Sequence, residues 1–174
     1  MDRIWDHHHP FFQKPYNTVP YYLNEHLTNK ERSEIQKVLK LIENSTCLTF
    51  EQVHRRPFYG YMYIQKNISK EPDYCGASGG RMYTYDIYVT LVEKCFQPHT
   101  IAHEIGHALG LDHTHQRSVR DKYVLVDPDR SSDDLRINFI KVDDSRTVGF
   151  PYDYGSMMHY DYTLVQLIRR EQLH

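Results

Sequence analysis

The eleven-residue stretch HEIGHALGLDH, which runs from His103 to His113, constrains this chain more than any other feature. It follows Pro98 in a segment whose apolar residues recur at helical spacing, and Gly110 stands where such a helix would end. His103 and His107 are four residues apart, so they would project from the same face of the helix, one turn from each other. Two imidazoles placed in this way can share one tetrahedral zinc ion at about 2.0–2.1 Å.

Glu104 follows the first of these histidines, where its carboxylate can reach a zinc-bound water without being a ligand itself. Gly110 permits a sharp turn, because glycine adopts positive φ at little cost, and the turn brings His113 in as a third ligand. Three protein ligands leave zinc with an open coordination position, which is typical of a catalytic site. The pattern therefore predicts one zinc ion that activates water for amide hydrolysis, with Glu104 as general base.

The alternative is that these histidines are incidental, because the chain contains twelve histidines in all. A pair at four-residue spacing is by itself more often incidental than catalytic. The glutamate, the glycine and the third histidine at fixed offsets favour the metal site. The run His7-His8-His9 is interpreted as flexible surface or an expression remnant, since adjacent histidines in a loop have no preset geometry.

The composition excludes several classes of function. With 174 residues, of which 40% are hydrophobic and 25% charged, the chain has the size of one globular domain. A formal net charge of −2 and isolated basic pairs leave no electrostatic footprint for nucleic acid. No apolar run approaches the roughly 18 residues that span a bilayer, and the first residues lack the apolar core of a signal peptide. We therefore expect neither nucleic acid nor a membrane as partner.

Two triplets have the form of N-glycosylation acceptors. They are Asn44-Ser45-Thr46 and Asn67-Ile68-Ser69. Each triplet alone is a weak signal, because such triplets are common by chance.

The remaining segments predict an α+β domain. Thr28 and Glu31 have the form of a capping box at the start of an amphipathic helix over residues 28–44. Residues 47–53, 58–65 and 79–92 alternate as strands do, with a loop over 75–80 before the third. That third strand, which contains Thr84 and Asp86, is either an exposed edge that pairs with an extended peptide or an ordinary covered strand. Apolar residues near the C-terminus, Leu164, Leu167 and Ile168, have the spacing of a short amphipathic helix.

The chain resembles the astacin family of zinc metalloendopeptidases. The pattern His-Glu-x-x-His-x-x-Gly-x-x-His is the metzincin signature, which a Met-turn accompanies downstream. Here YDYGSMMHY, residues 152–160, supplies that turn in the Ser-x-Met-His-Tyr form of the astacins. Other similar stretches are TCLTF after the first helix, the loop CGASGG, and residues 115–124 with Arg117, Arg120, Asp121 and Tyr123 in register. The resemblance extends from about Trp5 to Tyr162.

The resemblance implies a secreted zinc-dependent endopeptidase that acts on protein or peptide substrates. It implies these roles for residues of the site: His103, His107 and His113 as zinc ligands, Glu104 as general base, Met158 as the turn residue, and Tyr160 as a further, displaceable ligand that helps to hold the oxyanion. It also implies a disulfide between Cys75 and Cys95. Cys47 matches a cysteine whose partner lies near the end of the family's catalytic domain, and this chain has no fourth cysteine.

The expected fold is a single astacin-like peptidase domain over residues 1–174, α+β and metzincin-like, with two lobes and the zinc in the cleft. The N-terminal lobe, to about residue 110, would pack helices on a twisted mixed sheet, and the C-terminal lobe, about 111–174, would be short and irregular. After Tyr162 the family continues for several dozen residues, so we expect a C-terminally truncated member. The alternative function is a catalytically crippled zinc-binding domain that acts as a binding or regulatory module. A third hypothesis is an intracellular protein in which the metal has a structural role.

Overall fold

The computed structural model describes residues 17–55, 60–69, 73–78, 86–126, 137–143, 149–160 and 166–167. The chain divides into two compact units, Met1–Leu111 and Asp112–His174. The histidine run at 7–9 and Thr84 lie outside the described residues. Within the described part, no helix has the length and apolar composition that a membrane span requires.

The first helix of the first unit, α1 (Asn29–Ser45), begins with the expected capping box. The Thr28 hydroxyl accepts a hydrogen bond from the Glu31 N–H at 3.3 Å, and the Glu31 carboxylate accepts one from the Thr28 N–H at 2.7 Å. The helix buries one apolar stripe, formed by Ile35, Val38 and Leu39. The prediction of an amphipathic helix over this segment is confirmed.

Five strands of the first unit form one sheet in the order β2-β1-β3-β5-β4. They are β1 (Thr18–Leu23), β2 (Thr49–Gln52), β3 (Tyr61–Lys66), β4 (Gly76–Ala77) and β5 (Asp86–Leu91). The pairs of β1 with β2, β1 with β3, and β3 with β5 are parallel, whereas β4 pairs antiparallel with β5. The expected α+β class with a mixed sheet is confirmed.

Two details of the sheet differ from the expectation. The sequence pattern predicts a loop over 75–80, but Gly76 and Ala77 pair with Thr90 and Val89 and form β4. Strand β5 therefore lies inside the sheet, between β3 and β4. The interpretation of this strand as an exposed edge is wrong, because β4 occupies the edge instead.

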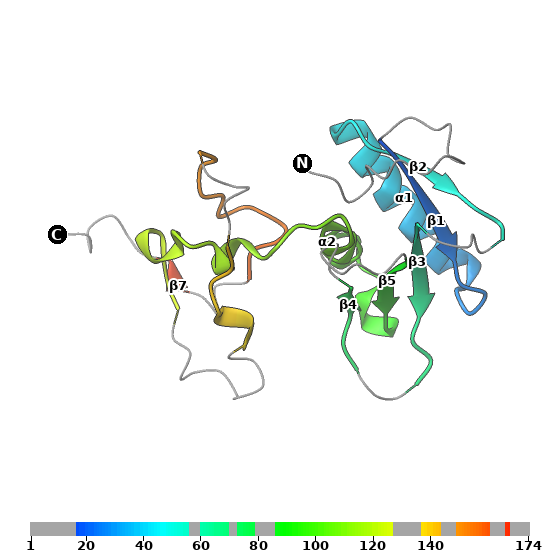
Figure 1. Cartoon of the computed structure of the whole chain (residues 1–174). Helices are drawn as coiled ribbons and strands as arrows, with labels where there is room; N and C mark the ends of the chain where they lie inside the picture. The colour runs from blue at the N-terminus through cyan, green and yellow to red at the C-terminus, as the bar shows by residue number, and fades with distance from the viewer. Residues whose placement is uncertain are drawn as a thin grey trace. The chain divides into compact units, whose positions relative to one another are not determined.

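One face of the sheet packs against both helices, α1 and α2 (Pro98–Ala108), as Figure 1 shows for this unit. Alternate strand residues point into this core, as their period of two requires. The buried strand residues include Val19, Leu23, Met62, Ile64, Val89 and Leu91. The opposite face of the sheet carries Tyr63 between Tyr22 and Tyr88, with ring centroids 5.6 and 5.5 Å apart.

A disulfide joins Cys75, next to β4, to Cys95 in the 3-10 turn that precedes α2. The two Cα atoms are 6.3 Å apart, within the usual range for a disulfide. The bond links the edge of the sheet to the start of α2. Cys47 is exposed and is the one free cysteine of the chain.

The described residues of the second unit are largely irregular, as expected for the C-terminal segment. They form 3-10 turns at Thr114–Gln116, Arg120–Lys122 and Ile137–Phe139. A two-stranded antiparallel ladder joins β6 (Val124–Leu125) to β7 (Gln166–Leu167). The expectation of a short helix over 164–168 is wrong at Gln166–Leu167, and its neighbours lie outside the described residues. Pairing with a strand about 40 residues earlier is a tertiary interaction, which local spacing does not predict.

Candidate metal centre

Helix α2 carries the first two predicted ligands. Pro98 occupies its first turn, where the missing N–H costs nothing, and Ile101, Ile105 and Ala108 are fully buried in the core. His103 and His107 lie outside this apolar stripe and are half-buried. The burial of the stripe therefore sets the direction in which the two imidazoles point.

The C-terminus of α2 is closed by the backbone of Gly110, which has a φ of 91°. The Gly110 N–H donates to the His107 carbonyl, and the Leu111 N–H donates to the Gly106 carbonyl, both at 2.9 Å. These two bonds form a Schellman motif, in which glycine is favoured at the left-handed position. The expected role of Gly110 as a helix terminator is confirmed.

The same turn positions an acceptor for the second imidazole. The Leu111 carbonyl oxygen lies 2.8 Å from His107 Nδ1. Because a carbonyl can only accept, this contact places the ring proton on Nδ1 and leaves Nε2 with its lone pair. His107 Nε2 lies 3.1 Å from His103 Nε2, and the two rings are perpendicular. The two nitrogens thus converge on one point beside the helix.

His103, His107 and His113 form the one group in the described residues that could hold a metal ion. Their ligand nitrogens all lie within 4.8 Å of one another. Tetrahedral coordination at about 2.0–2.1 Å would hold two nitrogens roughly 3.3 Å apart, which is close to the 3.1 Å between the Nε2 atoms of the helix pair. Three imidazoles are a donor set that suits zinc. The residues therefore fit the expected ion.

Glu104, between the helical ligands in sequence, is 6% exposed, and its Oε2 atom has no hydrogen-bond partner among the described residues. Burial raises the pKa of this carboxyl to about 7. An unsatisfied buried polar atom costs about 1–3 kcal/mol of folding free energy. Such a group, poised near neutral pH beside candidate metal ligands, is typical of an acid–base catalyst rather than of a structural residue.

In the second unit, the third histidine lies beside the predicted Met-turn. Met158 is 2% exposed, and its carbonyl accepts a hydrogen bond at 2.9 Å from the N–H of Thr114. The turn itself is closed by Ser156, whose carbonyl accepts from the His159 N–H and whose hydroxyl accepts from the Met158 N–H. The turn is therefore connected to the backbone of the residue that follows His113.

Tyr160, the predicted fourth ligand, also lies next to His113. The ring centroids of these two residues are 4.6 Å apart. Tyr160 is half-buried and packs against a small core whose buried members are Val124, Phe139 and Tyr152. The structure thus brings His113, Met158 and Tyr160 into one neighbourhood of the second unit.

Sequence reasoning missed one buried residue of this neighbourhood, His115. Its ring is fully buried, with its centroid 5.0 Å from that of His113 and 4.1 Å from that of Tyr160. His115 Nε2 lies 3.0 Å from the Asn138 carbonyl, which must accept its proton. The ring therefore packs beside both a predicted ligand and the predicted tyrosine.

Two arginines of the astacin-like stretch after His113 hold the surrounding chain. Arg117 donates to the Phe150 and Pro151 carbonyls at 3.0 and 2.9 Å. Arg120 donates to the carbonyl of His115 at 3.0 Å and also to that of Phe139. These charge-assisted bonds connect the ligand segment to the two loops that lie around it.

Comparison with known proteins agrees with these features. The family model for Astacin, a family of peptidases, matches residues 8–170. Zinc metalloproteinase nas-14 of Caenorhabditis elegans is 35% identical over 165 residues, which cover 91% of this chain and 29% of the relative. Low choriolytic enzyme of Oryzias latipes is 32% identical over 157 residues, or 89% of this chain and 54% of the relative. The chain thus spans about half the length of these curated relatives, or less.

Among solved structures, High choriolytic enzyme 1, a hatching enzyme zinc-protease from Oryzias latipes, superposes with a TM-score of 0.71 and 28% identity. The match covers 82% of this chain and 68% of that one. Myroilysin shares the fold, with a TM-score of 0.60 at 19% identity. With a family match over almost its whole length, this chain belongs to the astacin family of metalloproteinases.

Proposed function

We propose that this chain is a zinc-dependent endopeptidase that hydrolyses peptide bonds in protein or peptide substrates. One observation carries the proposal: helix α2 holds two converging imidazole nitrogens 3.1 Å apart and, between those histidines in sequence, a buried carboxyl with an unpaired oxygen. A purely structural metal site has no use for such a carboxyl. The names of the relatives, zinc metalloproteinase and choriolytic enzyme, support the same reaction class.

His103, His107 and His113 would hold one zinc ion. When bound, zinc supplies a water of lowered pKa and polarises the substrate carbonyl. Glu104 would take the proton from the attacking water and return it to the leaving amine, as a general base that then acts as a general acid. Burial of Glu104 keeps bulk water from its carboxylate and strengthens its interaction with the proton that it moves.

Tyr160 is proposed as the fourth, displaceable ligand, whose phenolic hydroxyl donates a hydrogen bond to the oxyanion. Its support is the 4.6 Å between its ring centroid and that of His113. Met158 is proposed to form the base of this region through its buried side chain. We also propose that residues 1–174 form a single peptidase domain, as the family match over residues 8–170 supports.

An extracellular location is part of the proposal. The disulfide between Cys75 and Cys95 supports it, because disulfides persist in oxidising compartments and are rare in the cytosol. The similarity to choriolytic enzymes points in the same direction.

The deciding experiment uses the full chain loaded with zinc and a mixed peptide library as substrate. Zinc content is measured by elemental analysis, and cleavage by mass spectrometry. We expect one zinc per chain and cleavage that a chelator abolishes. Glu104→Gln, which keeps the shape but not the basicity, should bind zinc and lose cleavage. Glu25→Gln, at an exposed position of the first unit, is the matched control and should cleave normally.

Two results would contradict the proposal. Full cleavage by Glu104→Gln would remove the base from the mechanism. One equivalent of zinc without any cleavage in the unmodified chain would favour the alternative, a zinc-binding module that acts by binding or regulation.

A further inference from the structure

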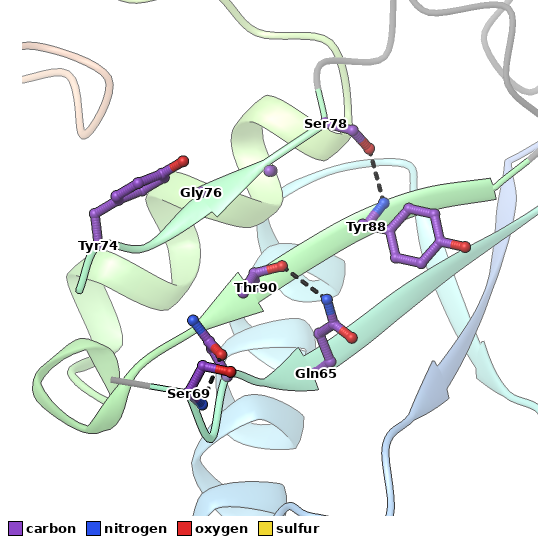
Figure 2. Close-up of a pocket in the computed structure, with 9 residues that line it drawn as sticks. Gln65, Ser69, Tyr74, Gly76, Ser78, Tyr88 and Thr90 are labelled. Atoms are coloured by element: carbon purple, nitrogen blue, oxygen red, sulfur yellow. Dashed lines mark hydrogen bonds between the residues drawn. The ribbon is translucent and has the colours of Figure 1, made fainter. Parts of the chain in front are cut away.

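A pocket of about 480 Å³ lies on the face of the sheet opposite the helices (Figure 2). Strands β3 and β5 form its floor with Gln65, Tyr88 and Thr90, and Tyr74, two residues before β4, lies at one side. None of its nine lining residues carries a charge at neutral pH. The volume falls within the range of about 300–1,000 Å³ that is usual for small-molecule sites.

The lining groups combine aromatic rings with neutral hydrogen-bonding groups. Tyr74 is 65% and Tyr88 37% exposed, and neither phenol has a hydrogen bond to another described residue. Gln65 Nε2 donates to the Thr90 hydroxyl at 3.0 Å, which leaves the Gln65 amide oxygen as an acceptor and the Thr90 hydroxyl as a donor. Rings that pack against C–H groups, with amide and hydroxyl partners and no charge, match the chemistry of a sugar.

An acceptor triplet for N-linked glycans borders the same pocket. Asn67 and Ser69 both line it, and they are the first and third residues of Asn67-Ile68-Ser69. The Asn67 N–H donates to the Leu91 carbonyl at 2.8 Å, which attaches this residue to the end of β5. Asn67 Oδ1 accepts a hydrogen bond from the Ser69 N–H at 2.9 Å, and Ile68 is 69% exposed. The triplet therefore forms a surface turn directly beside the pocket.

The other triplet, at Asn44, lies in a different environment. Asn44 and Ser45 belong to the last turn of α1. The Ser45 hydroxyl donates to the Leu41 carbonyl at 2.9 Å, and the Thr46 hydroxyl to the carbonyl four residues before it at 2.8 Å. Both hydroxyls thus bond to the helix backbone, and Asn44 is not among the residues that line the pocket. The structure distinguishes two triplets that the sequence leaves equivalent.

We propose that Asn67 carries an N-linked glycan whose innermost sugars lie in this pocket, with Tyr88 as their aromatic platform. The co-reactant is a lipid-diphosphate-linked oligosaccharide of the secretory pathway. The Asn67 side-chain nitrogen forms the bond to the anomeric carbon, the bond from that carbon to the diphosphate oxygen breaks, the amide loses one proton, and the lipid diphosphate leaves. This inference goes beyond peptide hydrolysis. It rests on only one part of the proposed function, the extracellular location of the chain.

The site is tested on the full chain, expressed in animal cells behind a cleavable secretion leader and recovered from both cells and medium. Enzymatic glycan release in heavy-oxygen water converts an occupied asparagine into a labelled aspartate, which peptide mass spectrometry locates. We expect the label at residue 67 and none at residue 44. An unlabelled residue 67, or a label at residue 44 alone, would overturn the site. The readout needs no substitution, and it applies equally to Glu104→Gln, so it is independent of peptidase activity.

Variants test the triplet directly. Asn67→Gln and Ser69→Ala should abolish the label at this position. Ser69→Thr, which keeps the hydroxyl, and Asn44→Gln should retain it. A label that persists at residue 67 in Ser69→Ala would contradict the assignment of this triplet.

The position of the sugars is tested by thermal unfolding. The glycosylated chain should unfold about 2–4 °C above Asn67→Gln. Tyr88→Ala should still carry the glycan at residue 67, but the glycan should no longer raise the unfolding temperature. Tyr22→Ala changes a tyrosine on the same sheet face that does not line the pocket, and it should keep the gain. An undiminished gain in Tyr88→Ala would overturn the placement of the sugars against Tyr88.

Discussion

The backbone N–H of Thr114 donates a 2.9 Å hydrogen bond to the carbonyl of Met158, and this bond joins the residue after a predicted zinc ligand to the Met-turn. The bond uses only backbone atoms, so it does not depend on the threonine side chain. The Met158 side chain is buried, so we expect its packing to stabilise the turn.

Met158→Ala should therefore lower both fold stability and zinc affinity. Truncation of a buried methionine to alanine costs about 2–5 kcal/mol, while replacement by leucine costs less than about 1.5 kcal/mol. Chemical denaturation and competition with a zinc chelator measure the two effects. Met157→Ala, at the exposed neighbouring position, is the control and should change neither. A stable Met158→Ala chain with normal zinc affinity would show that the turn does not support His113.

Gly110→Ala should weaken zinc binding through the position of the Leu111 carbonyl. A φ of 91° strains any side chain, so the Schellman turn shifts and His107 Nδ1 loses its acceptor. Loss of such a partner typically costs about 10–100-fold in metal affinity. Gly60→Ala imposes similar strain at a φ of 75°, in the same unit but away from the ligands. We expect both variants to lose stability. Only Gly110→Ala should lose zinc affinity, which titration calorimetry would measure.

The sequence predicts both helices well because their signals are local. The capping box at Thr28, the apolar stripes and the glycine after α2 each lie within one or two helical turns of the structure that they determine. For the same reason the sequence alone predicts that His103 and His107 project together from α2, as the structure shows. His103 and His107 are four residues apart, and residues at this spacing lie on one face of a helix.

The sequence does not predict strand β1, because Pro20 interrupts its pattern and proline is rare inside a sheet. The carbonyls of Asn17 and Tyr21 accept hydrogen bonds from the side of the sheet on which β2 lies. Pro20 is an odd number of residues from both, so its backbone nitrogen points to the other side, toward β3. Pairing with β3 begins only at Tyr21. The missing N–H of Pro20 therefore costs no ladder hydrogen bond. This outcome depends on the register of the strands, which is not visible in the sequence.

Other features could not be predicted because they depend on tertiary contacts. Strand β4 has two residues, Gly76 and Ala77, whose composition carries no strand signal, and it exists through its pairing with β5. His115 is a polar residue whose complete burial follows from rings contributed by distant segments. The pKa of Glu104 is also a consequence of burial, so the sequence predicts the base but not its acidity.

Glu31→Gln should destabilise the first unit in a pH-dependent way. Burial by itself raises the pKa of Glu31, but hydrogen bonds from Lys66 and from the Thr28 N–H hold it below its usual value. A lowered carboxyl pKa gives stability that is present above the unfolded value of about 4.3 and is lost as the pH falls through the folded value. The glutamine keeps the cap but removes the charge.

The expected cost of Glu31→Gln is about 1.5–3 kcal/mol at pH 7, and it should shrink as the pH falls below about 4. Urea denaturation of the metal-free chain at several pH values measures it. Glu93→Gln, which removes an 82% exposed partner of the same lysine, should cost less than about 1 kcal/mol. A cost for Glu31→Gln that does not vary with pH would contradict the role of the ion pair.

Tyr160→Phe should distinguish the role of the Tyr160 hydroxyl from the role of its ring. The ring packs 4.1 Å from His115 and 4.6 Å from His113, centroid to centroid, and phenylalanine preserves both contacts. Stability and zinc content should therefore stay close to those of the unmodified chain. If the hydroxyl donates to the oxyanion, its loss should reduce kcat by about 10²–10³-fold with little change in KM.

The matched control for this prediction is Tyr154→Phe, because the Tyr154 hydroxyl donates to the Tyr123 carbonyl at 3.2 Å and its ring packs against those of Tyr123, Tyr152 and His159. Steady-state kinetics on one cleaved peptide should show normal kcat for this variant. Equal rates for Tyr160→Phe and Tyr154→Phe would mean that the Tyr160 ring supports the ligand segment by packing alone. A lower kcat for Tyr160→Phe only, at full zinc occupancy, would assign the effect to the phenolic hydroxyl.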